Sequence, residues 1–208
     1  MSSFTGVPLE ALDFYEDLEA DNSKSWWTAH KATYDTAVQA PMAALGEALE
    51  DEFGAGKLFR PYRDVRFSKD KTPYKTHQGL FVARDGGAGF YVQVSAAGLM
   101  TAAGMRPEAE GLRRYRDAID SPSGSRLQEL VSGLLAEGFV VDGDQLATRP
   151  RGLPAGHPRE DLLRYKSLFV RREHGAPDWL PTPAAAEKVR AEWRRLRPLV
   201  DWLEDACT

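Results

Sequence analysis

Apolar residues recur at helical spacing in the first quarter of the chain. A short amphipathic helix is predicted by apolar side chains at three-residue steps. These are Leu9, Leu12, Tyr15 and Leu18. A second helix is predicted over residues 23–53, where an apolar stripe follows one face. We expect Pro41 to kink or restart this helix, because a proline ring blocks a hydrogen bond in a helix interior.

In the middle of the chain the pattern changes to short β-favouring segments bounded by turn residues. The clearest alternation is Phe90, Val92 and Val94 against Tyr91, Gln93 and Ser95. Glycine-containing turns separate these segments, as expected for hairpin connections. The predicted strands cover residues 63–68, 78–84, 89–95 and 99–105. The last three form a predicted antiparallel meander.

Helical spacing returns after Pro107, and a small hairpin is expected around Asp142-Gly143. The remaining predicted helices cover residues 112–119, 122–135, 158–164 and 183–205. We therefore predict an α+β fold, with an antiparallel β-sheet (the meander plus the small hairpin) and helices packed over one face. The chain is predicted to be a single domain, residues 1–208, with the last helix packing on the rest.

Composition indicates an ordinary globular protein. The chain has 208 residues and a net charge of −4, which argues against a protein that coats nucleic acid with its whole surface. Cys207 is its one cysteine, so neither an intramolecular disulfide nor a cysteine-based zinc site is expected. We see neither a signal peptide nor a run of about 18 apolar residues. A cytoplasmic location without membrane partners is expected.

Positive charge is concentrated in one stretch, residues 59–77. It carries six basic residues and only two aspartates, together with two tyrosines, two phenylalanines and two prolines. The basic residues are Arg60, Arg63, Arg66, Lys69, Lys71 and Lys75. Arginine suits anion binding because its planar guanidinium makes two parallel hydrogen bonds to a carboxylate or phosphate. We therefore predict a ligand-binding wall formed by these residues and Tyr74.

A second basic stretch, residues 148–166, has the same character and includes Arg151 and His157. Two proline-stiffened basic stretches in an acidic chain suggest one anion-binding pocket with two walls. The expected ligand is a small phosphorylated or carboxylated molecule. We expect this pocket only if the two stretches converge in space, which the sequence does not show.

Three side chains are candidates for acid–base chemistry. An unperturbed histidine titrates near neutrality, which makes His77 and His157 candidates, and we expect their basic neighbours to keep them neutral. Asp70 could act as a base, although a salt bridge with a neighbouring cation is the simpler interpretation. We expect neither a metal nor a cofactor, since the motifs and ligand spacing of metal sites are missing from the sequence. The sequence does not decide whether the protein is an enzyme.

Three alternatives to the pocket remain open. The basic residues could simply pair with Asp64, Asp70 or Asp161 and hold loops in place. A nucleic-acid-binding module would use the aromatic residues of the stretch to stack bases along a charged groove. A protein-interaction domain would dock the basic stretch on an acidic partner. Oligomeric state is not predicted.

The run R-D-V-R-F-S-K-D-K-T-P-Y-K-T-H at 63–77 resembles the signature of an uncharacterised bacterial and fungal family, domain-of-unknown-function family 2461. Further segments agree with it, namely 14–27, 89–94, 149–152 and 157–166. The chain departs from the family pattern at Trp27, where phenylalanine is typical, and at Ala102-Ala103-Gly104, where Gly-Ala-Gly is typical. The resemblance implies one domain over about residues 8–180 and brings no activity, substrate or catalytic residue.

Overall fold

The structure is a computed structural model that describes residues 4–66, 69–154 and 156–208. Its described residues pack as two compact units, and each unit is assembled from three separate segments. Unit 1 comprises Met1–Val82, Tyr91–Thr101 and Glu173–Ala191. Unit 2 comprises Ala83–Phe90, Ala102–Arg172 and Glu192–Thr208. Because several strands and the last helix pass from one unit into the other, neither unit is a continuous piece of sequence.

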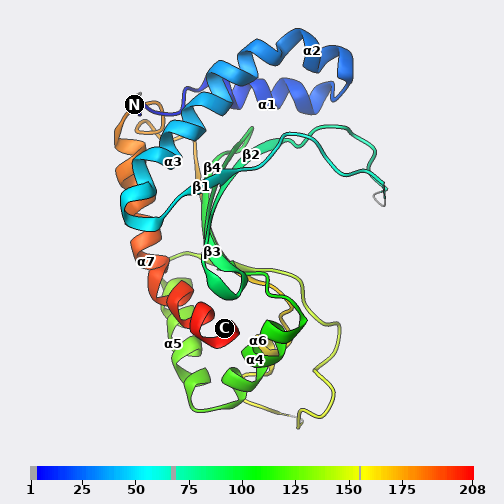
Figure 1. Cartoon of the computed structure of the whole chain (residues 1–208), viewed down its shortest axis with the longest axis vertical. Helices are drawn as coiled ribbons and strands as arrows, with labels where there is room; N and C mark the ends of the chain where they lie inside the picture. Colours follow the sequence, from blue (N-terminus) through cyan, green and yellow to red (C-terminus); the bar gives the residue numbers. More distant parts are fainter. Residues whose placement is uncertain (1–3, 67–68, 155) are drawn as a thin grey trace. The chain divides into compact units, whose positions relative to one another are not determined.

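Six strands of the described chain form one antiparallel sheet in the order β1-β2-β3-β4-β6-β5 (Figure 1). The strands are β1 Gly56–Leu58, β2 His77–Ala83, β3 Ala88–Ser95, β4 Gly98–Met105, β5 Val140–Asp142 and β6 Leu168–Gly175. The meander β2-β3-β4 agrees with the prediction from alternation, to within one residue at each strand end. The predicted α+β fold is confirmed.

Helices precede and follow the meander. Unit 1 holds α1 Glu10–Ala20, α2 Lys24–Thr33, the π-helix η1 Tyr34–Gln39 and α3 Ala40–Phe53. Unit 2 holds the 3₁₀ turn η2 Asp85–Gly87, α4 Ala109–Asp120, α5 Ser123–Ala136 and α6 Glu160–Leu163. The last helix, α7 Ala184–Cys207, begins in unit 1 and ends in unit 2, and it continues through Pro198. None of the described helices is both long and apolar enough to span a lipid bilayer.

The predicted helix over 23–53 is observed as α2, η1 and α3 joined end to end. Pro41 lies at the start of α3, directly after the π-helix, so the helix is locally widened where the proline lacks a donor. The helix ends at Gly54, whose φ of 96° suits glycine and few other residues. The predicted interruption at Pro41 is therefore a change of helix type.

Two predicted strands differ from the structure. Residues 63–66 are not part of a strand, while Phe67 and Ser68, the end of that predicted strand, lie outside the described residues. Strand β5 pairs with β6, with Val141 opposite Val170, and not with a segment directly after Asp142-Gly143, as the predicted small hairpin would require. Gln145 instead forms an isolated bridge to Tyr165. Asp142-Gly143 thus redirects the chain without making a two-strand hairpin of its own.

The core of unit 2 is built around Trp193 on α7, which is fully buried. Its indole lies against the ring of Phe90, with 5.4 Å between the ring centroids. Arg172 on β6 lies over the ring of Phe139 at 3.8 Å and makes two hydrogen bonds, of 2.9 and 3.0 Å, to the carboxylate of Glu192. The charge of Arg172 is therefore compensated where the side chain is mostly buried.

Candidate functional site: a basic hairpin and the sheet face at its base

Alternation along β1 and β2 separates two faces of the sheet in unit 1. Leu58 pairs with Leu80, and Leu80 contacts Gly46 of α3 so closely that a side chain at Gly46 would collide with it. The residues next to Leu58 and Leu80 in the chain point to the opposite face of the sheet, because side chains alternate along a strand. Phe59 and Phe81 lie there, with their rings 6.5 Å apart and 12° from parallel. Figure 1 shows α3 on one side of these strands.

Gln78 fixes the position of this face from the buried side. Its side chain is 1% exposed and lies between helix and sheet. Its Nε2 donates to the carbonyls of Phe59 (2.8 Å) and Gly79 (2.9 Å), while its Oε1 accepts from the Tyr34 hydroxyl at 2.6 Å. Tyr34 is the first residue of the π-helix, and burial raises its pKa to about 12, so it remains a donor.

Tyr91 of β3 extends the exposed face toward the next strand. Its ring lies over Gly79, where a Cβ would overlap the phenol, and its hydroxyl donates to Gln93 Oε1 at 2.9 Å. The ring centroid is 6.1 Å from that of Phe59. Glycine at position 79 is therefore what allows Tyr91 to lean across β2. Burial raises the pKa of Tyr91, so its hydroxyl stays protonated.

Lys75 supplies positive charge to the same face. Its Nζ donates to the Arg60 carbonyl at 3.0 Å and lies 5.2 Å from the centre of the Phe59 ring. Burial, and secondarily the charge of Arg60, lowers the pKa of Lys75. Within the described part of the chain, no carboxylate pairs with this ammonium. Phe59, Lys75, His77, Phe81 and Tyr91 are called the aromatic–basic face below.

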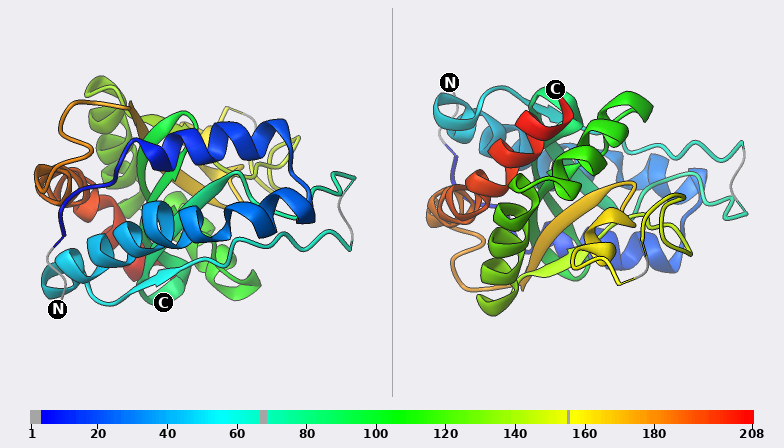
Figure 2. Two further views of the ribbon diagram at one scale, coloured as in Figure 1. Left: turned by 90° about the horizontal axis from the view of Figure 1, so that it is seen from above. Right: turned by 90° about the horizontal axis from the view of Figure 1, so that it is seen from below.

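Residues 59–66 and 69–77 run as two arms that start at this face and extend away from the sheet, which Figure 2 shows in two views. The arms are hydrogen-bonded to each other, from Arg63 N to the Pro73 carbonyl (2.9 Å) and from Lys75 N to the Pro61 carbonyl (2.8 Å). Tyr62 and Tyr74 form an isolated bridge between them. The predicted basic stretch is therefore a hairpin that continues β1 and β2, and we call it the basic hairpin.

Several of its cations serve the hairpin itself. Arg63 forms an ion pair with Asp70 and also donates to the Thr72 hydroxyl at 3.0 Å. Arg66 makes two hydrogen bonds to Asp64, of 2.9 and 2.6 Å. The interpretation of these two arginines as partners in ion pairs therefore agrees with the structure. Lys71 donates to the Val65 carbonyl at 2.8 Å.

Asp70 is held by the same contacts. It accepts hydrogen bonds from the backbone N–H of Thr72 at 2.9 Å and from its hydroxyl at 2.8 Å. These bonds, more than the partner Arg63, lower the pKa of Asp70. The carboxylate is thus a turn-forming acceptor in this structure, and a lowered pKa makes it a weaker base.

The α1–α2 connection holds the hairpin in place. The Asn22 amide donates to the Tyr74 carbonyl at 3.0 Å and accepts from the Tyr74 N–H at 3.1 Å, so it pairs with the hairpin as a strand residue would. The Trp27 ring stacks on Tyr74 at 4.2 Å and 7°. Tyr74 is consequently 5% exposed, whereas Tyr62 on the other arm is 49% exposed.

His77 begins β2 on the aromatic–basic face, half-buried. Burial lowers its pKa from the ordinary value of 6.5, and the charges of Lys75 and Arg63 lower it further. The expected neutral imidazole is therefore consistent with its surroundings, although burial contributes more than the basic neighbours do. A neutral ring can accept a proton from a molecule bound on this face.

The lowered pKa of His77 predicts a pH-dependent stability. As the pH falls below about 6.5, this histidine takes up a proton more readily in the unfolded chain than in the folded one, which lowers the free energy of unfolding. Above that pH both states are neutral and the contribution is absent. Urea unfolding between about pH 7.5 and 5.5 should show a larger loss for the unmodified chain than for His77→Gln. Equal losses would contradict this assignment.

His157 and Arg151 belong to unit 2. The Arg159 N–H donates to His157 Nδ1 at 3.1 Å, so Nε2 carries the proton that faces Asp120 Oδ1 at 3.0 Å. Nε2 of His157 therefore holds the loop to the end of α4, while Nδ1 accepts a hydrogen bond within the loop itself. This arrangement indicates a structural role.

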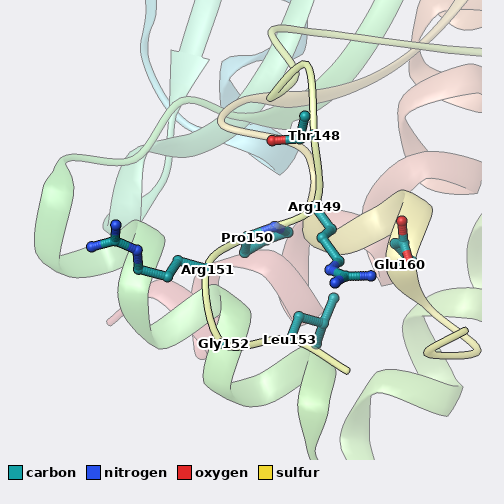
Figure 3. Close-up of a pocket in the computed structure, with 7 residues that line it drawn as sticks. All are labelled: Thr148, Arg149, Pro150, Arg151, Gly152, Leu153 and Glu160. Carbon is teal, nitrogen blue, oxygen red and sulfur yellow. The ribbon is translucent and has the colours of Figure 1, made fainter. Parts of the chain in front are cut away.

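Arg151 lines an open recess of about 650 Å³ (Figure 3). Its lining residues are Thr148, Arg149, Pro150, Arg151, Gly152, Leu153 and Glu160. In Figure 3 the Arg149 side chain points toward Glu160, while Arg151 points away from both. A carboxylate near the guanidinium opposes binding of an external anion there, so the recess is the weaker candidate.

The structure gathers part of the predicted site around the aromatic–basic face. Arg60, Lys75 and His77 lie at the base of the basic hairpin, and Arg63, Arg66, Lys69, Lys71 and Asp70 lie on its arms. Phe59, Phe81 and Tyr91 were not among the predicted site residues. Alternation over 89–95 was the available signal, because it placed Tyr91 opposite the apolar side of its strand. Among the described residues, no group of three or more His, Cys, Asp or Glu side chains is arranged to hold a metal.

These features define an α+β protein with a basic hairpin rooted on an antiparallel sheet. A family model described as a conserved hypothetical protein, DUF2461, matches residues 10–202. The chain therefore belongs to this family, and the resemblance seen in the sequence is confirmed. Neither a curated protein nor a solved structure matches the chain.

Proposed function

We propose that the protein binds a small phosphorylated or carboxylated ligand at the aromatic–basic face. The observation that carries this proposal is Lys75, a half-buried lysine whose ammonium contacts a carbonyl and an aromatic ring and has no carboxylate partner among the described residues. Removing an ammonium from water is costly unless an opposite charge compensates it. A bound anion would supply that charge.

The cations at the base of the hairpin favour a small anion. Arg63 and Arg66 are compensated by aspartates of the same hairpin, and Lys69 and Lys71 lie farther along its arms, so the cations at its base are Arg60 and Lys75. Two cations and a neutral imidazole suit one phosphate or one carboxylate group. The proposal concerns binding, with His77 available to exchange a proton with the ligand, and it requires neither Arg151 nor His157.

Thermal unfolding against a panel of anions tests the proposal. The panel would contain phosphate, pyrophosphate, ribose 5-phosphate and dicarboxylates, each at low and moderate salt. A ligand at about 100 times its dissociation constant stabilises the folded state by about 2.7 kcal/mol, a shift of roughly 5–10 °C for a chain of this size. Lys75→Gln should weaken the affinity of the bound anion about tenfold, because it removes one charge-assisted hydrogen bond.

The matched control is Lys24→Gln, which removes the same charge from an exposed lysine of unit 1. Both variants change the net charge by the same amount, so a difference between them reports the position of the lysine rather than the total charge. Similar affinities for Lys75→Gln and Lys24→Gln would contradict the proposal, as would the absence of any shift with the whole panel.

Exposed aromatic side chains favour a second candidate, a nucleic-acid-binding module. Tyr62 is 49% and Phe59 38% exposed, and both adjoin basic residues of the hairpin. Bases of a single strand can stack on such rings while the phosphates contact lysine and arginine. Salt separates the two candidates, because a strand loses affinity with a log–log slope of about −0.7 per phosphate contacted. A small ligand would show a shallow slope.

We also propose a cytoplasmic location. The one cysteine, Cys207, is buried as a free thiol beside Met105, and burial raises its pKa to about 11. Disulfides form in oxidising compartments, and a chain with a single cysteine forms no disulfide within itself. Detection of the tagged protein in the cytoplasmic fraction of its host would test this.

A further inference from the structure

The ring systems at the base of the hairpin indicate what else the ligand carries. Five large hydrophobic side chains are exposed among the described residues, and the two aromatic ones, Phe59 and Tyr62, both lie on the basic hairpin. Exposed aromatic rings beside cations are typical of sites that stack planar rings next to an anionic group. The anion alone does not require them.

Phe59 is the exposed ring nearest the ammonium of Lys75. Lys75 Nζ lies 5.2 Å from its centre, and Phe81 and Tyr91 surround it at 6.5 and 6.1 Å. Tyr62 instead contacts Trp27 and Tyr74. A molecule whose anion binds Lys75 therefore meets Phe59 first, with Phe81 extending the aromatic surface beside it.

The position of Phe59 is fixed by its backbone. Its N–H donates to the Gly79 carbonyl at 3.0 Å, and its carbonyl accepts from the Gln78 side chain at 2.8 Å. Both partners are buried residues of β2. A ring presented on such a fixed backbone loses little freedom when a ligand stacks on it, which favours binding.

Charge extends along the same face. Lys57 of β1 is exposed and pairs in register with Phe81, so it flanks the aromatic rings on the side away from Lys75. An extended anion with a planar ring in its middle, or a ring with one phosphate at either end, would complement this order of charge, ring and charge. A small sugar phosphate or dicarboxylate would leave Phe59 and Phe81 uncovered.

We infer that the ligand is a nucleoside phosphate, whose base stacks on Phe59 while its phosphate binds Lys75. This inference rests on the proposed function, since it assigns a ligand class to the same site. A free nucleotide and a single strand share this chemistry, and the experiment below separates the two sources.

Isothermal titration would compare three probes: adenosine 5′-monophosphate, ribose 5-phosphate and a ten-residue oligodeoxyadenylate. The first two carry the same phosphate and differ in the base. Stacking predicts that the nucleotide binds about 5- to 150-fold more tightly than the sugar phosphate. Phe59→Leu should bring that ratio close to one while ribose 5-phosphate affinity is retained, and Phe59→Tyr, which keeps the ring, should restore it.

The outcomes distinguish this inference from the proposed function. Equal affinities for the nucleotide and the sugar phosphate, or a ratio that survives Phe59→Leu, would overturn the inference and leave anion binding intact. Binding of none of the probes would overturn both. Tighter binding of the oligonucleotide, lost with salt and weakened by Tyr62→Leu, would support stacking and identify a strand as the source of the nucleotide. Tight, salt-tolerant binding of the mononucleotide would support a free nucleotide.

Discussion

Replacing Trp193 by alanine is expected to lower the free energy of unfolding by about 3–5 kcal/mol. The indole is fully buried in unit 2 and packs against Phe90 at 5.4 Å between centroids. Removing it leaves a large cavity that neighbouring side chains fill only in part. For a chain of this length the midpoint of thermal unfolding should fall by roughly 6–20 °C.

Lys188→Ala is the control for this prediction. Lys188 lies on the same helix, α7, and is exposed, so truncation there should change stability by less than about 0.5 kcal/mol. Urea unfolding of the two variants under one condition compares them directly. A loss below about 1 kcal/mol for Trp193→Ala would show that the helix does not pack as described.

Gln78→Leu is expected to cost about 2–3 kcal/mol, although the substituted side chain is similar in size. The variant leaves the buried hydroxyl of Tyr34 without its acceptor and removes the donor to the Phe59 carbonyl. Unsatisfied buried polar groups cost about 1–3 kcal/mol each, and the exposed position of Phe59 allows water to compensate part of the loss.

A double-mutant cycle makes the Gln78 prediction specific. Tyr34→Phe removes the hydroxyl that needs an acceptor, so the double variant should be less destabilised than the sum of the two single variants. The expected coupling is about 1 kcal/mol or more. Additive effects would mean that the 2.6 Å hydrogen bond between these two side chains does not contribute. Gln78→Leu should also weaken nucleotide binding, because it releases Phe59.

Alternation predicted β3, the middle strand of the meander, well because this strand buries one side more deeply than the other. Phe90, Val92 and Val94 face the buried side, and the intervening residues are half-buried, as the sequence suggested. The pairing of β5 was not predicted, since Asp142-Gly143 favours a local hairpin while the observed partner, β6, lies about 30 residues further along the chain. A short window of sequence does not indicate which distant segment a strand pairs with.

The candidate site was predictable in its charge but not in its geometry. Clustered lysines and arginines marked the hairpin, yet nothing in their order separated Arg63 and Arg66, which pair with aspartates, from Lys75, which does not. Phe59 joins Phe81 and Tyr91 only through the register of β1 on β2 and the absence of a side chain at Gly79. Register is a property of the assembled sheet.

The most direct test of anion binding at the aromatic–basic face is an NMR titration. Backbone amides of ¹⁵N-labelled protein would be followed while ribose 5-phosphate is added at low salt. We expect the largest shifts at residues 59, 60, 62 and 75–77, with those shifts strongly reduced in Lys75→Gln. Largest shifts around residues 148–153, or a spectrum that does not change, would contradict the account.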